Sequence, residues 1–215
     1  MERLAAWAKY HRMRIDRARG AFEKRQFTTH VFDRGSEAAD FFFSEISPDE
    51  TIGYGGSETV TELGVRHRLR DGDYRFVDRS LYGHGYNDQL DIRRQTLSAD
   101  VFVASSNAVS IEGALVNIDG DGNRIAGLSL GPKRVVLFIG RSKLCETLDQ
   151  AIFRARNVAA PALAIQHRMK TPCAASGRCH DCSSPERICQ NLSIIERCHP
   201  PGRIQILFIN EDLGL

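Results

Sequence analysis

Five of the six cysteines of the chain lie within one short stretch, between Cys173 and Cys198. Four of them follow the spacing Cys173-x5-Cys179-x2-Cys182-x6-Cys189, which contains one Cys-x-x-Cys pair. Four thiolates can ligate tetrahedral zinc or a [4Fe–4S] cluster, and this spacing does not distinguish the two. Reduced thiols without a metal are the alternative. We predict a metal or cluster site with a structural role, because four cysteines would close the ligand shell.

A glycine-rich turn follows a short predicted strand and opens a predicted helix; it reads Gly53-Tyr54-Gly55-Gly56-Ser57. Glycines let the backbone approach a ligand closely, a serine here can cap the helix, and the free N–H groups of a helix N-terminus attract an anion. The turn matches neither the Walker loop nor the G-x-G-x-x-G fingerprint. Its spacing supports anion binding and a purely structural turn equally.

Polar side chains are dense between residues 104 and 124, directly after a predicted buried strand. Ligands of open α/β sheets gather outside the carboxyl ends of strands, so this segment is a candidate binding region. The stretch from Asp119 to Asn123 imitates a calcium loop, but Arg124 and Leu130 stand where that loop needs glycine and glutamate, which excludes calcium. The DGDG run instead predicts a hairpin turn. Glu112 and Arg124 are an acid and a cation that could meet beside a polar substrate.

The histidines give no comparable signal. His30, His67, His84 and His167 stand in no metal-binding or nucleophile motif, and we expect them to be surface or packing residues. The run Gly127-Leu128-Ser129-Leu130-Gly131 matches the letters Gly-x-Ser-x-Gly, but a predicted strand follows it and not the helix that a nucleophile elbow requires; the chain has no His-Glu-x-x-His motif. Serine-hydrolase and zincin chemistry are therefore not indicated.

The elements that must position these residues alternate between strand and helix patterns. Strands are predicted at 51–54, 74–77, 100–104, 134–140 and 203–209, and helices at 36–46, 58–69, 90–98 and 147–158. The run RVVLFIG at 134–140 is almost entirely apolar, which is typical of a covered central strand. A hairpin is predicted between 115–118 and 125–130. This order predicts an α/β fold, a layered and mostly parallel sheet with helices on both faces and a hairpin insert.

The N-terminal residues and the cysteine-rich stretch differ in composition from the rest of the chain. Residues 1–28 form a predicted helix with eight basic and three acidic side chains, and its apolar stripe favours a solvated helix packed on the domain over a nucleic-acid-binding arm. Residues 29–215 are predicted to be one α/β domain. Within it, about 170–202 is a cysteine-rich insertion, because an apolar strand pattern follows it.

Composition excludes several classes of protein. Among 215 residues, 29 basic and 27 acidic side chains give a net charge of +2, so charge alone predicts neither a nucleic-acid nor a membrane partner. The hydrophobic share of 42% and charged share of 26% are those of a folded globular protein. No apolar run approaches membrane-spanning length, and the first residues lack a signal core. We expect a cytoplasmic protein, in which structural disulfides are rare.

Several ordered blocks resemble the lactate-utilisation (LUD) domain family over roughly residues 20 to 215. They are IGYGGSETVTELG, ADVFVASSNAVSIEGALVNIDGDGNRIAGLSLGPKRVVLFIGRSKL, AIFRARNVAAP, TPCAASGRCHDCSSPERICQ and PGRIQILFINEDLG. The fourth block is similar to the four-cysteine segment of a stand-alone subgroup of that family. The resemblance implies a fold similar to the sugar-phosphate isomerase and CoA-transferase superfamily.

The resemblance also implies a site. The ligand-binding residues would be Gly55, Gly56, Ser57, Asn107, Asn117, Asp119, Asn123 and Arg124, and Glu112 would be the catalytic candidate, since CoA-transferases use a glutamate nucleophile. The implied function is binding of a small anionic metabolite in 2-hydroxy acid (lactate) oxidation, carried out directly or assisted beside iron–sulfur oxidation subunits. The alternatives are a redox or assembly partner with an iron–sulfur cluster, and a CoA- or folate-linked enzyme. The organic cofactor and a homo-oligomeric state stay open.

Overall fold

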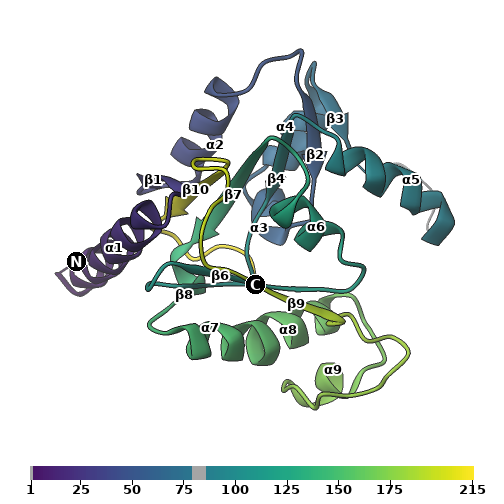
Figure 1. Cartoon of the computed structure of the whole chain (residues 1–215). Coiled ribbons are helices and arrows are strands. Elements are labelled where there is room, and N and C mark those ends of the chain that lie inside the picture. The colour runs from purple at the N-terminus through teal and green to yellow at the C-terminus, as the bar shows by residue number, and fades with distance from the viewer. Residues whose placement is uncertain (1, 79–85) are drawn as a thin grey trace.

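Two sheets stand at the centre of the computed structural model, which describes residues 2–78 and 86–215 (Figure 1). The larger sheet has six parallel strands in the order β1-β10-β7-β4-β2-β3. Its strands are β1 (Thr28–Phe32), β2 (Thr51–Tyr54), β3 (Arg75–Val77), β4 (Val101–Ala104), β7 (Arg134–Gly140) and β10 (Ile204–Ile209). The predicted α/β class with a mostly parallel sheet is confirmed.

The smaller sheet has four strands in the order β8-β5-β6-β9. They are β5 (Ala108–Ser110), β6 (Ala114–Asp119), β8 (Leu144–Cys145) and β9 (Asn191–Ile195). β6 pairs antiparallel with β5 and with β9, whereas β8 pairs parallel with β5. β9 belongs to the cysteine-rich segment, so the end of that segment is an edge strand of this sheet.

Helices surround the two sheets. They are α1 (Glu2–Lys24), α2 (Gly35–Ser44), α3 (Glu58–Glu62), α4 (Val65–Asp71), α5 (Tyr86–Leu97), α6 (Asn123–Ser129), α7 (Leu148–Arg154), α8 (Ala160–Gln166) and α9 (Pro172–Ser176). A π-helical turn, Ala155–Ala159, joins α7 to α8, and a 3-10 turn, Arg141–Lys143, follows β7. In Figure 1, α7 and α8 lie along the smaller sheet on the side away from the larger one.

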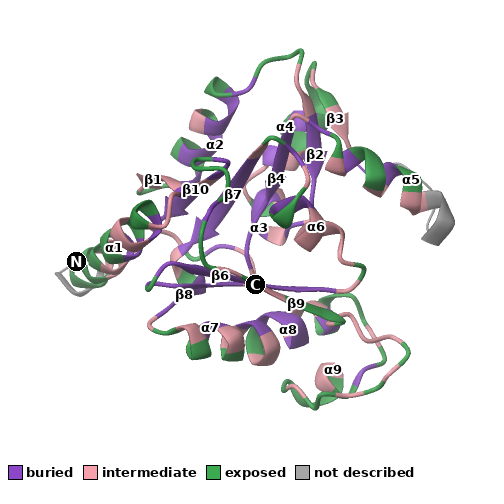
Figure 2. Cartoon of the chain, viewed as in Figure 1, coloured by how far each residue is buried: buried purple, intermediate pink, exposed green. Residues whose placement is uncertain are grey.

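The four inner strands of the larger sheet, β2, β4, β7 and β10, are largely buried because each of their faces packs on a different layer (Figure 2). In β4, Phe102 belongs to a core shared with α1, α6 and the smaller sheet, whereas Val101 and Val103 belong to a core shared with α2, α3 and α4. A third cluster joins the smaller sheet to α7 and the π turn. Because successive side chains of a strand point to opposite faces, neighbouring residues of one strand enter different cores. The continuous apolar runs in the sequence do not show which residue enters which core.

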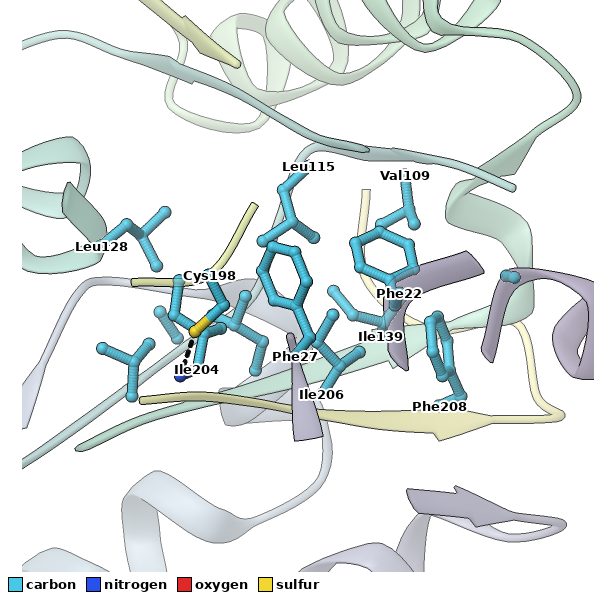
Figure 3. Close-up of a cluster of buried hydrophobic side chains, with 14 of the residues drawn as sticks. Phe22, Phe27, Val109, Leu115, Leu128, Ile139, Cys198, Ile204, Ile206 and Phe208 are labelled. Carbon is cyan, nitrogen blue, oxygen red and sulfur yellow. Dashed lines mark hydrogen bonds between the residues drawn. The ribbon is translucent and has the colours of Figure 1, made fainter. Parts of the chain in front are cut away.

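Cys198 lies in the first of these cores, between the sheets (Figure 3). Its side chain is fully buried, and its Sγ accepts a hydrogen bond from the Ile204 backbone N–H at 3.2 Å. Phe22 of α1 is buried in the same core. Burying a side chain of this size contributes about 1.5–3 kcal/mol, so α1 is held to the domain by its apolar stripe as predicted.

The predicted hairpin at the DGDG run is wrong. β6 runs through the first aspartate, Asp119, and the chain then enters α6 instead of a second strand. Gly122 adopts a left-handed conformation (φ 82°), and the Asp119 carboxylate accepts the backbone N–H groups of Gly122, Arg124 and Ile125 at 2.9–3.1 Å. An aspartate that caps three amides starts a helix, whereas a hairpin needs them for the partner strand. The actual hairpin is β5–β6, one step earlier.

Other elements also differ from the sequence prediction, among them β5, β8, β9 and α9, which were not predicted. The helix expected over 58–69 is two helices, because Gly64 adopts a left-handed conformation (φ 71°) between α3 and α4. Strand β1 was not predicted, since its five residues are only partly buried and include His30 and two threonines. The helix expected over 147–158 continues through the π turn to Gln166. His84 lies outside the described residues.

Candidate functional site

A cavity of about 380 Å³ opens at the carboxyl ends of β2, β4 and β7. β2 and β4 are neighbours in the sheet, and the chain reverses direction across the sheet between them, because β3 lies on one side of β2 and β4 on the other. Ligands of open α/β sheets bind at such a reversal. The lining residues are Tyr54, Gly56, Ser57, Glu58, Thr61, Arg66, Asp78, Ser105, Ser106, Asn107, Arg124, Lys143, Ala159, Leu163, His167 and Leu215.

The glycine-rich turn forms one wall. The Tyr54 hydroxyl accepts the Ser57 N–H at 2.8 Å and lies 2.9 Å from the Ser57 carbonyl oxygen, so the tyrosine closes the turn. Gly56 takes a left-handed conformation (φ 71°), in which a residue with a side chain would be strained. Ser57 caps α3 by accepting the Val60 N–H. α3 has only five residues, so its dipole adds little to anion binding, and the positive charge of the site comes from side chains.

The loop after β4, Ser105 to Asn107, forms the facing wall. The Ser105 hydroxyl donates to the Phe138 carbonyl of β7 at 2.7 Å, and the Ser106 hydroxyl lies 3.0 Å from two carbonyl oxygens of the smaller sheet. Asn107 Oδ1 accepts the Ile118 N–H at 2.9 Å. These bonds hold the loop rigidly across both sheets, which suits a binding wall.

Lys143 reaches the cavity from the 3-10 turn after β7. Its side chain is buried, with 4% of the residue exposed, and its Nζ donates to Ser105 Oγ at 3.0 Å and to the Ser106 carbonyl at 3.2 Å. Burial lowers the pKa of Lys143 to about 7, and the positive charges of Arg154 and Arg124 act in the same direction. A lysine that is partly uncharged at neutral pH in a cavity marks a candidate functional site.

Three arginines give the cavity a cationic character. Arg66 holds the buried Asp78 by two hydrogen bonds of 2.9 and 3.3 Å, and Arg124 donates to Asn107 Oδ1 at 2.7 Å. Arg154 stands behind the wall, with Nη1 donating to the carbonyl oxygens of Asn107 and Leu215. Burial lowers the pKa of Arg154, a guanidinium that stays charged at any physiological pH.

The structure brings together only part of the residue set implied by the family resemblance. Gly56, Ser57, Asn107 and Arg124 line the cavity. Gly55 is adjacent, but a Cβ there would meet the Phe102 ring at 2.7 Å, so this glycine is needed for packing.

The remaining three polar candidates lie outside the cavity lining. Asp119 caps α6, which carries Arg124, and therefore acts through that arginine. Asn117 is fully buried in β6 between the sheets, and Asn123 is the first residue of α6. Ligand binding by these side chains stays a prediction that the geometry does not support.

Glu112 is placed elsewhere. It lies exposed at the turn of the β5–β6 hairpin, where its carboxylate accepts the Leu148 N–H at 3.2 Å and contacts the Ser110 hydroxyl. It is absent from the cavity lining and does not meet Arg124 there. The pairing of an acid and a cation expected from the sequence is not formed by these two residues.

Sequence reasoning missed Lys143, Arg66 and His167. Lys143 lies shortly after the end of β7, and the rule that ligands gather after strand ends could have found it, as it found Ser105 and Asn107. Arg66 lies within a predicted helix and His167 lies outside every predicted element, and nothing in their spacing indicates that α4 and the end of α8 meet at one cavity. His167, expected to be a surface or packing residue, is exposed at the rim.

The cysteine segment lies away from this cavity, in the loop around α9. Cys173, Cys179, Cys182 and Cys189 are partly buried and form no disulfide. Within the described ranges, no three histidine, cysteine or acidic side chains gather into a metal-binding group. Burial raises the pKa of the Cys189 thiol, which opposes the deprotonation that ligation requires. The loop as folded therefore presents no preformed four-thiolate shell, and the metal site stays a prediction.

Comparison with known proteins agrees with this architecture. The family model of the LUD domain matches residues 15–209. The chain belongs to the LUD domain family. The match runs from within α1 to the end of β10, so both sheets and all the named cavity-lining residues except Leu215 lie within the LUD domain. This membership relates the protein to lactate utilisation in general terms.

A solved structure has the same fold. The crystal structure of a DUF162 family protein from Deinococcus radiodurans covers 93% of this LUD chain and 98% of its own, with a TM-score of 0.51 at 10% sequence identity. An identity this low supports the shared fold alone. No curated protein matches the chain. In the part of the chain that the structure describes, no helix is both long enough and apolar enough to cross a bilayer.

Proposed function

We propose that the cavity binds a small anionic metabolite, a 2-hydroxy acid such as lactate or its 2-oxo form, and that the protein acts in or assists the oxidation of such acids. The observation that supports the proposal is the convergence of Lys143 and Arg124 on the Ser105–Asn107 loop, at the carboxyl ends of β4 and β7. Membership of the LUD domain family supplies the connection to lactate.

The chemistry of the lining suits a ligand of this kind. Guanidinium groups bind carboxylates through paired hydrogen bonds, and the serine hydroxyls can bind the hydroxyl or carbonyl oxygen of the ligand. Among the described lining residues, both acids are already engaged: Asp78 pairs with Arg66, and Glu58 accepts the Gln166 amide at 2.8 Å. The volume of about 380 Å³ is near the lower end for ligand pockets, which favours a small metabolite over an entire CoA molecule.

Calorimetric titration and thermal unfolding with L-lactate and with pyruvate test this proposal. A ligand at a hundredfold excess over its dissociation constant should stabilise the protein by about 2.7 kcal/mol. Arg124→Met should weaken binding about tenfold or more, whereas Arg94→Met, on the exposed face of α5, should leave it unchanged. Circular dichroism checks that both variants fold.

The same titration separates the alternatives. Stabilisation by CoA or a folate, with no response to either small acid, would replace the proposal with a CoA- or folate-linked enzyme. No response to any of these ligands would remove the binding function and leave the redox or assembly role of the cysteine segment as the function to test. Association with iron–sulfur oxidation subunits, a cytoplasmic location and a homo-oligomeric state stay predictions.

A further inference from the structure

We propose that Lys143 is a covalent anchor that forms an imine with the carbonyl carbon of a small 2-oxo acid bound in the cavity. The inference rests on the proposed function, because a 2-oxo acid is what oxidation of a 2-hydroxy acid produces. It goes further by assigning to Lys143 a covalent bond to the ligand instead of an electrostatic contact.

The hydrogen bonds of Lys143 orient its amine. The single proton of the Ser105 hydroxyl is donated to Phe138 at 2.7 Å, so Ser105 Oγ is an acceptor toward Lys143 Nζ at 3.0 Å. The Ser106 carbonyl at 3.2 Å can only accept. An uncharged amine has two N–H groups and one lone pair, and these two acceptors occupy both N–H groups. The lone pair of Lys143 Nζ therefore occupies the remaining tetrahedral position, and Lys143 lines the cavity.

The surroundings of Lys143 favour the uncharged amine. The described ion pairs do not include Lys143, and the charges that lower its pKa are those of Arg154 on α7 and Arg124 on α6. Glu62 and Glu58 on α3 act in the opposite direction and more weakly. His167 at the end of α8 also lines the cavity, as do Arg66 and Asp78, which pair with each other. Desolvation beside other cations is how proteins activate a lysine as a nucleophile.

Arg124 is placed to bind the carboxylate of the same ligand. It lines the cavity with Lys143, and its guanidinium is oriented by Asn107 Oδ1 and the Ile118 carbonyl. A 2-oxo acid carries its carboxylate on the carbon that the amine attacks. One cation and one neutral amine are therefore the pair of groups that this class of ligand requires.

The step balances without another reactant. The amine nitrogen forms a bond to the carbonyl carbon, and the carbonyl oxygen leaves as water with the two amine hydrogens. No electron acceptor is needed, in contrast to oxidation of the 2-hydroxy acid itself. Borohydride then adds hydride to the imine and converts it into a stable secondary amine that mass spectrometry can locate.

The test incubates the full chain with pyruvate and sodium borohydride at pH 7, followed by intact mass and peptide mapping. We expect one reduced pyruvyl group per chain, on Lys143, and none in Lys143→Arg. The exposed Lys133 is the internal comparison. We expect its adduct to be lower by about tenfold or more, because an ordinary lysine at pH 7 is uncharged about a thousandfold less often than a group with a pKa of about 7.

The outcomes separate this inference from the function on which it rests. An adduct confined to Lys143 supports both. Pyruvate binding by calorimetry without an adduct overturns the imine and leaves the binding site intact. An adduct spread evenly over surface lysines, or one that persists in Lys143→Arg, overturns the assignment to Lys143. Absence of both binding and adduct overturns the two proposals together.

Discussion

Substitution of Lys143 by methionine should change how the stability of the protein depends on pH. The folded-state pKa of about 7 lies below the ordinary value of 10.5. Between these two pH values the unfolded chain binds more protons than the folded one, so stability rises with pH. The full cost of burying the charge is present below about pH 7 and disappears as pH approaches 10.5.

The size of the effect follows from the shift. The shift of the Lys143 pKa from 10.5 to about 7 corresponds to a loss of about 5 kcal/mol in the free energy of unfolding at low pH. About 1.5 kcal/mol of this free energy is regained between pH 7 and pH 8.5. The upper pH of 8.5 avoids titration of the buried Cys145 and the partly buried Cys189, whose raised thiol pKa values would lower stability at higher pH. Lys143→Met removes the titrating group, and we expect it to abolish this rise.

Reversible urea unfolding at pH 7.0 and 8.5 measures the effect. The wild-type midpoint should increase by about 0.5–1 M urea over this interval, and the Lys143→Met midpoint should not. Lys133→Met is the matched control, because Lys133 is 89% exposed and its removal should preserve the rise. An equal change of the urea midpoint between pH 7.0 and 8.5 in the wild type and in Lys143→Met would show that Lys143 titrates as an ordinary lysine. That result would refute the electrostatic reasoning about the cavity.

Four further variants test a helix cap, the packing at two glycines and the cysteine segment. Asp119→Ala should lower the free energy of unfolding by about 2 kcal/mol, because three backbone N–H groups at the start of α6 lose their acceptor; a loss under half of that in urea unfolding would contradict the capping role. Gly127→Ala should lower the free energy of unfolding by about 1–3 kcal/mol, because a Cβ would lie 2.6 Å from the Phe102 ring. Gly20→Ala in α1, where a Cβ would meet open space, should instead raise it by about 0.5–1 kcal/mol. Similar effects of the two variants would contradict the close packing at Gly127. Elemental analysis after anaerobic purification should find zinc or iron that is lost in the double variant Cys179→Ser, Cys182→Ser; equal metal content in the two proteins would leave the cysteines as free thiols.

Much of the fold was readable from local patterns. Strands β2, β4, β7 and β10 are runs of apolar residues bounded by turns, and their burial on both faces of a parallel sheet is the reason that they read so clearly. The hairpin prediction failed at Asp119 because DGDG suits either a turn or a helix start. The choice depends on which amides the carboxylate caps, and this is settled only in the folded chain.

The sequence by itself determined the fold class, the family and two of the walls of the site, since a glycine turn and a polar loop after a strand are local features. Tertiary structure decided which other groups join the predicted Arg124. Lys143 and Arg66, which the sequence did not indicate, come from separated segments and meet Arg124 because the ends of β2 and β7 and the start of α6 lie at one cavity. The lowered pKa of Lys143 is equally a tertiary property, because it arises from burial and from distant arginines brought near. Glu112 shows the converse: it is close to the polar loop in sequence, but the β5–β6 hairpin carries it away from the cavity.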